Sequence, residues 1–319
     1  MSDQAGEEAT SLFHQSSVTN QTTCGQVDRS ADLFFMMVHG LVFLVGLPLN
    51  GFIVTFYFCR AQQKTSSSIT IYLKNLVAAD FLVCLCLPIR VAKYASSSVT
   101  LHLVNCNVAR AVLLLNIYAS IMFMGYIAAN RYLKVVQPLG THILLTVRAA
   151  HIISTATWVF LLATMSAFVV LSFQTQKPFT SVLETCEYSH TGQFSLVMKI
   201  IYSCANVMFL SVLASLVFFY YSTSRRVALV QQRLAASSCF TKLARTRRNM
   251  LVLVSVFCFC FVPYHLVHLP KEFLCSSGKF LYNVKEVTII MSVLNVCLDP
   301  LIYFILCKRF RTQFGLLGK

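Results

Sequence analysis

The sequence predicts an all-α integral membrane protein, a bundle of seven transmembrane helices followed by a short C-terminal amphipathic helix. Of its 319 residues, 57% are hydrophobic and only 12% are charged, about half the charged share of an ordinary soluble domain. A helix that crosses a bilayer needs roughly 20 mostly apolar residues, so the chain can hold seven spans joined by short loops. It leaves no room for a separate soluble catalytic domain.

Seven apolar segments separated by polar clusters are the expected spans. They cover residues 34–58, 69–94, 103–132, 148–172, 194–222, 249–273 and 281–306. We therefore expect an extracellular segment at 1–33, a membrane domain at 34–306 and a cytosolic tail at 307–319. Phe310, Phe314 and Leu317 recur at helical spacing among basic residues of the tail, which favours an amphipathic helix on the membrane surface.

The distribution of charge predicts the orientation. The net charge is +15, and the segments between spans 1 and 2, 3 and 4, and 5 and 6, together with the tail, contain basic but no acidic residues. By the positive-inside rule these segments are cytosolic, and the N-terminus is outside the cell. Asn20, in Asn-Gln-Thr, is then a glycosylation acceptor on the outer side. Because the basic residues lie between spans, they do not indicate nucleic-acid binding.

Short motifs occur in the successive spans. They are Leu49-Asn50-Gly51, Asn75 to Asp80, Cys106 with Asn130-Arg131-Tyr132, Trp158, Cys260-Phe261-Val262-Pro263 and Asp299-Pro300-Leu301-Ile302-Tyr303. Cys106 and Arg131 are 25 residues apart, and a helix of that length covers roughly 38 Å, one membrane with its interfaces. Together and in this order, the motifs resemble those of rhodopsin-like G-protein-coupled receptors, which implies a multi-pass protein of the plasma membrane.

The later spans resemble one branch of that class more closely. Cys260 to His265, Val284 to Glu286 and Asn295 to Pro300 are similar to the ADP-receptor-like purinergic receptors, a branch that also holds lysophospholipid and orphan receptors. Leu87 to Arg90 and Asn130 to Pro138 instead look like hydroxycarboxylic-acid and oxo-eicosanoid receptors. The resemblance implies a small anionic ligand, a nucleotide or nucleotide sugar, and an inhibitory G protein. A lysophospholipid, a platelet-activating-factor-like lipid or a carboxylated lipid is the alternative.

A cluster of basic residues is the candidate ligand pocket. In the outer thirds of the spans lie Arg90, Lys93, Arg110, Lys199, His265, His268 and Lys285. Cations at membrane depth need a counter-charge, and few acids are near, so an anionic ligand is expected. The alternative for Lys93 and Lys199 is that they extend to lipid headgroups, and His265 and His268 could be core hydrogen-bond donors. The resemblance favours His268 and Lys285 as ligand contacts.

Two further sites are expected along the bundle axis. Asp80, Asn116, Ser120, Asn295 and Asp299 offer the oxygen ligands that hard cations prefer, and the resemblance implies a sodium ion there as the one structural cofactor. At the cytosolic mouth, the resemblance assigns G-protein coupling to Arg131, Tyr132 and Tyr303, with Tyr220 or Tyr221 as a further partner of Arg131. Asn130 replaces the usual acid, which predicts raised basal activity.

The resemblance also implies disulfides on the outer side, Cys106 with Cys186 and Cys24 with Cys275. Among other functions, an enzyme is not expected, because no metalloprotease-like, Gly-x-Ser-x-Gly-like or phosphate-loop motif occurs. A transporter is the remote alternative, although the sequence has neither the internal repeats nor the matched broken helices typical of that class.

Overall fold

The computed structural model of the chain describes residues 29–59, 67–96, 98–137, 142–174, 192–234, 238–268 and 279–306. Within these ranges the chain is helical apart from short turns and helix ends, and seven helical segments are long and apolar enough to cross a membrane. The predicted all-α fold with seven spans is confirmed. The tail 307–319, Asn20 and the cysteines Cys24, Cys186 and Cys275 lie outside the described residues.

Five spans are single helices. They are α1 (Arg29–Cys59), α2 (Ser68–Ala95), α5 (Val147–Gln174), α6 (Gly192–Leu234) and α7 (Ser238–His268). The third span comprises α3 (Val99–Val104), the π-helical turn η1 (Asn105–Ala109) and α4 (Arg110–Val136), and the seventh comprises α8 (Lys279–Val293) and α9 (Asn295–Leu306). A 3-10 turn, η2 (Ile143–Leu145), precedes α5.

The predicted inner edges of the fifth and sixth spans were wrong. The apolar pattern stops at residue 222 and resumes at 249, but α6 continues to Leu234 and α7 begins at Ser238. Hydropathy detects only the part of a helix that faces lipid. The intervening residues include Ala, Arg, Gln and Leu and no Gly or Pro, so their helix propensity extends both helices beyond the membrane.

The seventh span is broken at Leu294, between α8 and α9. Proline has no N–H group, so Pro300 cannot donate to the carbonyl four residues earlier, which is that of Val296. The Asn50 side-chain Nδ2 donates to this carbonyl at 2.9 Å, and also to the Gly46 carbonyl at 3.0 Å. Asn50 on α1 therefore satisfies the backbone group that Pro300 leaves open and connects α1 to α9.

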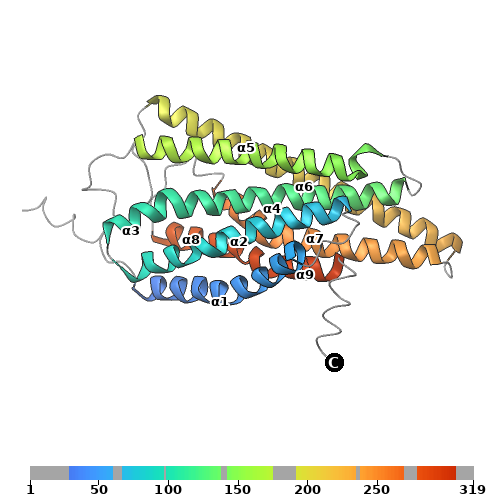
Figure 1. Cartoon of the computed structure of the whole chain (residues 1–319), viewed down its shortest axis with the longest axis horizontal. Helices are drawn as coiled ribbons and strands as arrows, with labels where there is room; N and C mark the ends of the chain where they lie inside the picture. The colour runs from blue at the N-terminus through green and yellow to red at the C-terminus, as the bar shows by residue number, and fades with distance from the viewer. Residues whose placement is uncertain are drawn as a thin grey trace, which may run out of the picture.

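The third span runs through the middle of the bundle, as Figure 1 shows for α4. Of its most apolar 18-residue stretch, 78% is buried, against 11% for the corresponding stretch of α6. Large fully buried side chains, among them Ile117, Phe123, Phe257 and Phe261, fill the interior. Trp158 on α5 donates to Asn75 on α2 at 2.8 Å, which connects two of the motif residues.

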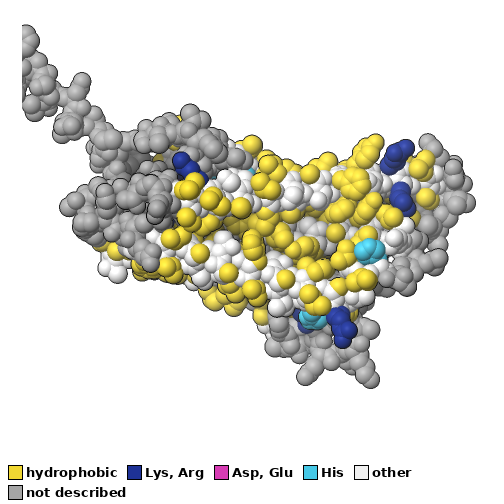
Figure 2. Space-filling view, turned by 90° about the horizontal axis from the view of Figure 1, so that it is seen from above, with side chains coloured by type: hydrophobic (Ala, Val, Ile, Leu, Met, Phe, Trp, Pro, Cys, Tyr) yellow, Lys and Arg dark blue, Asp and Glu magenta, His cyan; other side chains and the backbone are white. Residues whose placement is uncertain are grey.

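The outer surface is that of a membrane protein. On the face in Figure 2, hydrophobic side chains cover the middle of the bundle, and Lys and Arg lie toward its ends. Exposed large apolar residues include Leu41 and Leu44 on α1, Phe160 on α5 and Val207 on α6. Lipid is the solvent that makes such a surface stable.

Candidate functional site

The predicted site residues lie at two ends and in the middle of the bundle. We call the end that holds the N-terminus of α1 the Arg90 end, and the opposite end the Arg131 end. Figure 1 shows α3 and α8 at the former. Which end faces the cytosol remains a prediction.

An ion cluster joins α2 to α8 at the Arg90 end. The guanidinium of Arg90 donates to Glu286 at 3.2 Å, and the Lys93 ammonium donates to the other carboxylate oxygen at 3.3 Å. The Tyr94 hydroxyl donates to Glu286 at 2.7 Å. Only 5% of the Arg90 side chain and 7% of that of Glu286 is accessible. In these direct contacts one carboxylate serves two cations, and the carboxylate of Asp32 on α1 also lies within electrostatic range of Lys93.

Aromatic rings surround this cluster. Lys93 lies 4.7 Å from the ring centre of Tyr94 and 5.8 Å from that of Tyr282, distances at which a ring face attracts a cation. Tyr94 also contacts the rings of Phe35 and His39 on α1. Helices α1, α2 and α8 thus form a wall that is both basic and aromatic. The sequence identified the cations but not the tyrosines, which have no motif of their own.

Arg110 lies on the opposing set of helices. It donates to the Tyr202 hydroxyl of α6 at 3.3 Å and lies 5.9 Å from the ring centre of Phe168 on α5. Tyr264 on α7 lies within electrostatic range of both Arg110 and Arg90. The two arginines are therefore both near Tyr264, and their contact with a ligand stays a prediction.

The other predicted contacts are in different surroundings. His265 is buried, its Nδ1 is 2.8 Å from the Phe261 carbonyl, and its ring stacks on Phe209 with centres 3.7 Å apart. His268 is similarly placed, with Nδ1 at 2.9 Å from the Tyr264 carbonyl and its ring stacked on Tyr264. His265 is buried like a core histidine, whereas His268 is half-buried, and its role as a ligand contact stays a prediction. Lys285 is half-buried, whereas Lys199 is exposed on α6.

The polar residues in the middle of the bundle form one cluster. Asp80, Asn116, Ser120, Asn295 and Asp299 are at most 1% exposed. Asn116 donates to Asp80 at 3.0 Å. In the orientation that satisfies its amide, Asn295 donates to both Asp299 oxygens, at 2.8 and 3.1 Å, and accepts from Ser120 at 3.1 Å.

The two carboxyl groups of this cluster lie within electrostatic range of each other. Two acids this close share a proton or a cation, because both cannot be ionised without a counter-charge. Asp80 Oδ2 has no hydrogen-bond partner among the described residues. Carboxylate, amide and hydroxyl oxygens are ligands for hard cations, so the donor set fits sodium.

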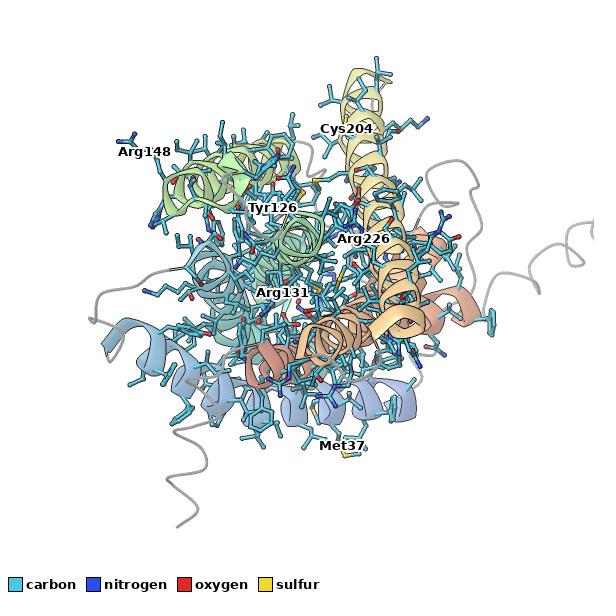
Figure 3. All side chains as sticks on the ribbon, turned by 90° about the vertical axis from the view of Figure 1, so that its right-hand side faces the viewer. Met37, Tyr126, Arg131, Arg148, Cys204 and Arg226 are labelled. Atoms are coloured by element: carbon cyan, nitrogen blue, oxygen red, sulfur yellow. The ribbon has the colours of Figure 1, made fainter. Side chains whose placement is uncertain are left out.

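Arg131 and its neighbour Asn130 connect helices at the Arg131 end through hydrogen bonds. Arg131 donates to the carbonyl of Leu306, the last residue of α9, at 3.3 Å. Asn130 donates to the Ser68 hydroxyl at the start of α2 at 2.7 Å. Figure 3 views this end and places Arg131 among the helix ends, whereas Arg148 projects from α5 at the periphery.

Aromatic residues hold the neighbouring helices at this end. Tyr132 stacks on Phe219 of α6, with ring centres 4.8 Å apart. Tyr303 is fully buried beside Tyr57 of α1, and its hydroxyl lacks a partner among the described residues. Tyr221, one of the two residues suggested as a partner of Arg131, is 64% exposed.

The π-helical turn η1 contains Cys106. This cysteine is disulfide-bonded, and its partner lies outside the described residues, so the pairing with Cys186 stays a prediction. Hydropathy alone does not signal such a turn, which adds a residue to one turn of helix.

The motifs that the structure brings together match a known family. The model of the "7 transmembrane receptor (rhodopsin family)" matches residues 49–303. The chain belongs to this family. The receptor is 29% identical to G-protein coupled receptor 87 of Mus musculus over 94% of the chain and 86% of that protein. It is 30% identical to purinoceptor 14 of Bos taurus, over 86% of the chain and 82% of that protein.

A third relative is probable G-protein coupled receptor 34 of Mus musculus, 25% identical over 93% of the chain and 80% of that protein. These relatives confirm the resemblance to the purinergic-like branch. The receptor is therefore a multi-pass plasma-membrane protein and not an enzyme, and its partners are a G protein and a small extracellular ligand. Because the chain belongs to a receptor family, the transporter alternative no longer applies.

Proposed function

We propose that the receptor binds a small anionic ligand, a nucleotide or nucleotide sugar, at the Arg90 end. The observation that carries this proposal is the sharing of one carboxylate, that of Glu286, by Arg90 and Lys93. A phosphate group has several charged oxygens and could replace Glu286 as the partner of both cations in a partly dry site. The similarity to a protein named as a purinoceptor supports a nucleotide-type ligand.

Arg110 and Lys285 would complete the recognition of such a ligand. Arg110 approaches from α4 beside Tyr202, and Arg90 from α2, with Tyr264 within electrostatic range of both. An extended ligand with two charged groups could engage both arginines, as a nucleotide diphosphate would. The Arg90 end is extracellular in this proposal, and the Arg131 end contacts an inhibitory G protein through Arg131, Tyr132 and Tyr303.

A lipid is the second candidate ligand. The rings of Phe35, Tyr94 and Tyr282 lie beside the cations of the ion cluster, and a lysophospholipid, a platelet-activating-factor-like lipid or a carboxylated lipid pairs a charged group with apolar atoms. The same cations would bind its phosphate or carboxylate, so the two candidates share the anionic anchor.

The test is an inhibitory-G-protein assay, the fall in cyclic AMP, on cells that express the receptor. Nucleotides and nucleotide sugars, lysophospholipids and carboxylated lipids are compared, and the best agonist is repeated on Arg90→Ala and Lys285→Ala. We expect at least about a tenfold loss of potency on each, since a charge-assisted contact contributes about 1.5 kcal/mol or more. Surface expression of each variant, measured with an N-terminal epitope tag, is the control. An agonist with full potency on both variants would overturn the proposed pocket.

We further propose that sodium binds between Asp80 and Asp299 and stabilises the resting receptor. Its support is the proximity of two buried carboxyl groups surrounded by oxygen donors. Agonist affinity should fall as sodium replaces a large organic cation in wild type, and this dependence should vanish in Asp80→Asn. Equal sodium sensitivity in the two proteins would remove the site.

A further inference from the structure

A hollow lies between α7 and α9 at the Arg131 end, away from the proposed ligand pocket. Its volume is about 220 Å³, and it is lined by Arg245, Arg248, Asn249, Phe304 and Ile305. The three α7 residues follow at spacings of three and four and so share one face of the helix. The two helices pack against each other, so the hollow is bounded by both.

The basic residues of the hollow face no acid of the described chain. The described acids are Asp32, Asp80, Glu286 and Asp299, and these lie at the Arg90 end or in the middle of the bundle. The neighbouring sequence, residues 223–248, contains no Asp or Glu either. The described residues therefore supply no anion to the hollow.

Asn249 adds a buried polar group to the hollow. Its residue is 6% exposed, and its side-chain oxygen has no hydrogen-bond partner among the described residues. A buried polar atom without a partner is costly, so a water that donates both to this oxygen and to a bound phosphate would stabilise this position. Arg245 and Arg248 are exposed and can turn toward a bound group.

The hollow lies at the depth of lipid headgroups. The membrane-spanning part of α7 begins at Leu243, and that of the seventh span ends at Leu306. A span of 26 residues is roughly 39 Å long, which exceeds the hydrocarbon core of about 30 Å. The first turns of α7 and the last turn of α9 therefore lie in the headgroup layer.

One wall of the hollow continues onto the surface that faces lipid tails. Phe304 is 44% exposed, and Leu301, one turn earlier on α9, is 51% exposed. The other wall carries the two guanidinium groups of α7. The hollow thus places guanidinium groups beside an apolar surface that faces lipid. A phospholipid has a phosphate next to acyl chains, so it fits this arrangement better than a free anion does.

We propose that this hollow binds an anionic phospholipid of the adjoining leaflet. The phosphate contacts Arg245 and Arg248, and an acyl chain lies along Phe304 and Leu301. The site is separate from the ligand pocket and needs neither an agonist nor a G protein.

The test uses the full-length receptor purified in detergent, with lipid retention measured by native mass spectrometry. The probe is dioleoyl phosphatidic acid, titrated against dioleoyl phosphatidylcholine. Arg245→Gln with Arg248→Gln should weaken retention of phosphatidic acid by at least about tenfold, since a hydrogen bond to a charged group contributes about 1.5 kcal/mol or more. Both side chains are exposed, so these changes should leave the fold intact, and thermal unfolding checks this.

Arg226→Gln with Arg247→Gln is the matched control, because it removes the same charge at the same end from residues that do not line the hollow. We expect it to change retention far less, because neither side chain lines the hollow. An equal loss in this control would mean a diffuse attraction of the surface for anions and would overturn the proposal, as would unchanged retention in the Arg245 and Arg248 variant.

Two further arms distinguish other occupants. Glycerol phosphate, which has the headgroup but no acyl chain, should not displace the lipid; displacement at equal concentration would identify a free-phosphate site instead. If the Arg245 and Arg248 variant lost G-protein activation but kept its lipid, the arginines would serve the G protein, and the proposal would fall. Failure of the ligand screen would leave this experiment unaffected.

Discussion

Glu286 shows how a single side chain determines the charge of the proposed pocket. It accepts from Arg90, Lys93 and Tyr94, and it is 6% exposed. A buried charge is stable at this depth only with a partner of opposite charge, because an unpaired charge would lose its hydration without compensation. An anionic ligand therefore competes with Glu286 for the same cations, and the resting pocket has an internal anion.

Replacing this carboxylate tests the pairing. Glu286→Gln would leave two cations without their acceptor, and removal of one member of a buried pair typically costs about 3–5 kcal/mol. We expect a clear fall in the unfolding temperature of the purified receptor. Glu286→Asp, which keeps the charge, should lose less. Equal unfolding temperatures for wild type and Glu286→Gln would contradict the pairing.

Asn130 supports a second prediction at the scale of one residue. Its amide donates to Ser68 on α2, so it gives Arg131 no negative charge. Asn130→Asp would place a carboxylate beside Arg131 and stabilise the resting arrangement. Ligand-free G-protein activation should therefore be measurable in wild type and lower in Asn130→Asp. Absence of any ligand-free output from both proteins would count against this prediction.

At the scale of the helix, the seventh span depends on a residue from the first. The Val296 carbonyl lacks the N–H of Pro300 and accepts from Asn50 instead. Asn50→Leu should lower the free energy of unfolding by about 1–3 kcal/mol, the cost of leaving a buried acceptor without a donor.

A double-mutant cycle isolates this contact from other effects of the substitution. In the Pro300→Ala background the backbone N–H is present, so Asn50→Leu should cost less than it does in wild type. Thermal or denaturant unfolding of the four proteins in detergent measures the difference. Additive losses would show that Asn50 does not act through the carbonyl freed by Pro300.

The spans could be predicted because a run of apolar residues as long as the bilayer is thick is a strong signal. The ends of α6 and α7 could not, since a helix need not stop where its lipid-facing part ends. Leu294, where the seventh span breaks, is itself apolar and has no local signal. The contact between Asn50 and the carbonyl that Pro300 leaves open could not be predicted either, because Asn50 comes from a different helix.

The residue types of the candidate site could be predicted from the sequence, but most of their contacts could not. Basic residues at the outer depth of the spans could be counted from the sequence, and Arg90 and Arg110 are both near Tyr264. The pairing of Arg90 with Glu286 joins residues 196 positions apart, and no local pattern contains that information. His265 and His268 could be placed on α7, but their backbone contacts and ring stacking depend on helix rotation.

At the scale of the whole molecule, the proposed roles of the Arg90 end and the Arg131 end both depend on the orientation of the receptor in the membrane. The basic segments predict that the N-terminus is outside and the Arg131 end is cytosolic. An epitope at the N-terminus should be detected on intact cells, and one at the C-terminus only after permeabilisation. Detection of both on intact cells would reverse the assignment of one end and would contradict an odd number of crossings.

The uneven burial of the helices has a consequence for motion. The apolar stretch of the third span is 78% buried, whereas that of α6 is 11% buried. If α6 moved, most of its surface would stay in contact with lipid. Little empty volume would open inside the protein. The third span has no such freedom, because any shift would strip packing on all sides. Rearrangements of the bundle should therefore take the third span as a fixed axis, with α6 swinging at its edge.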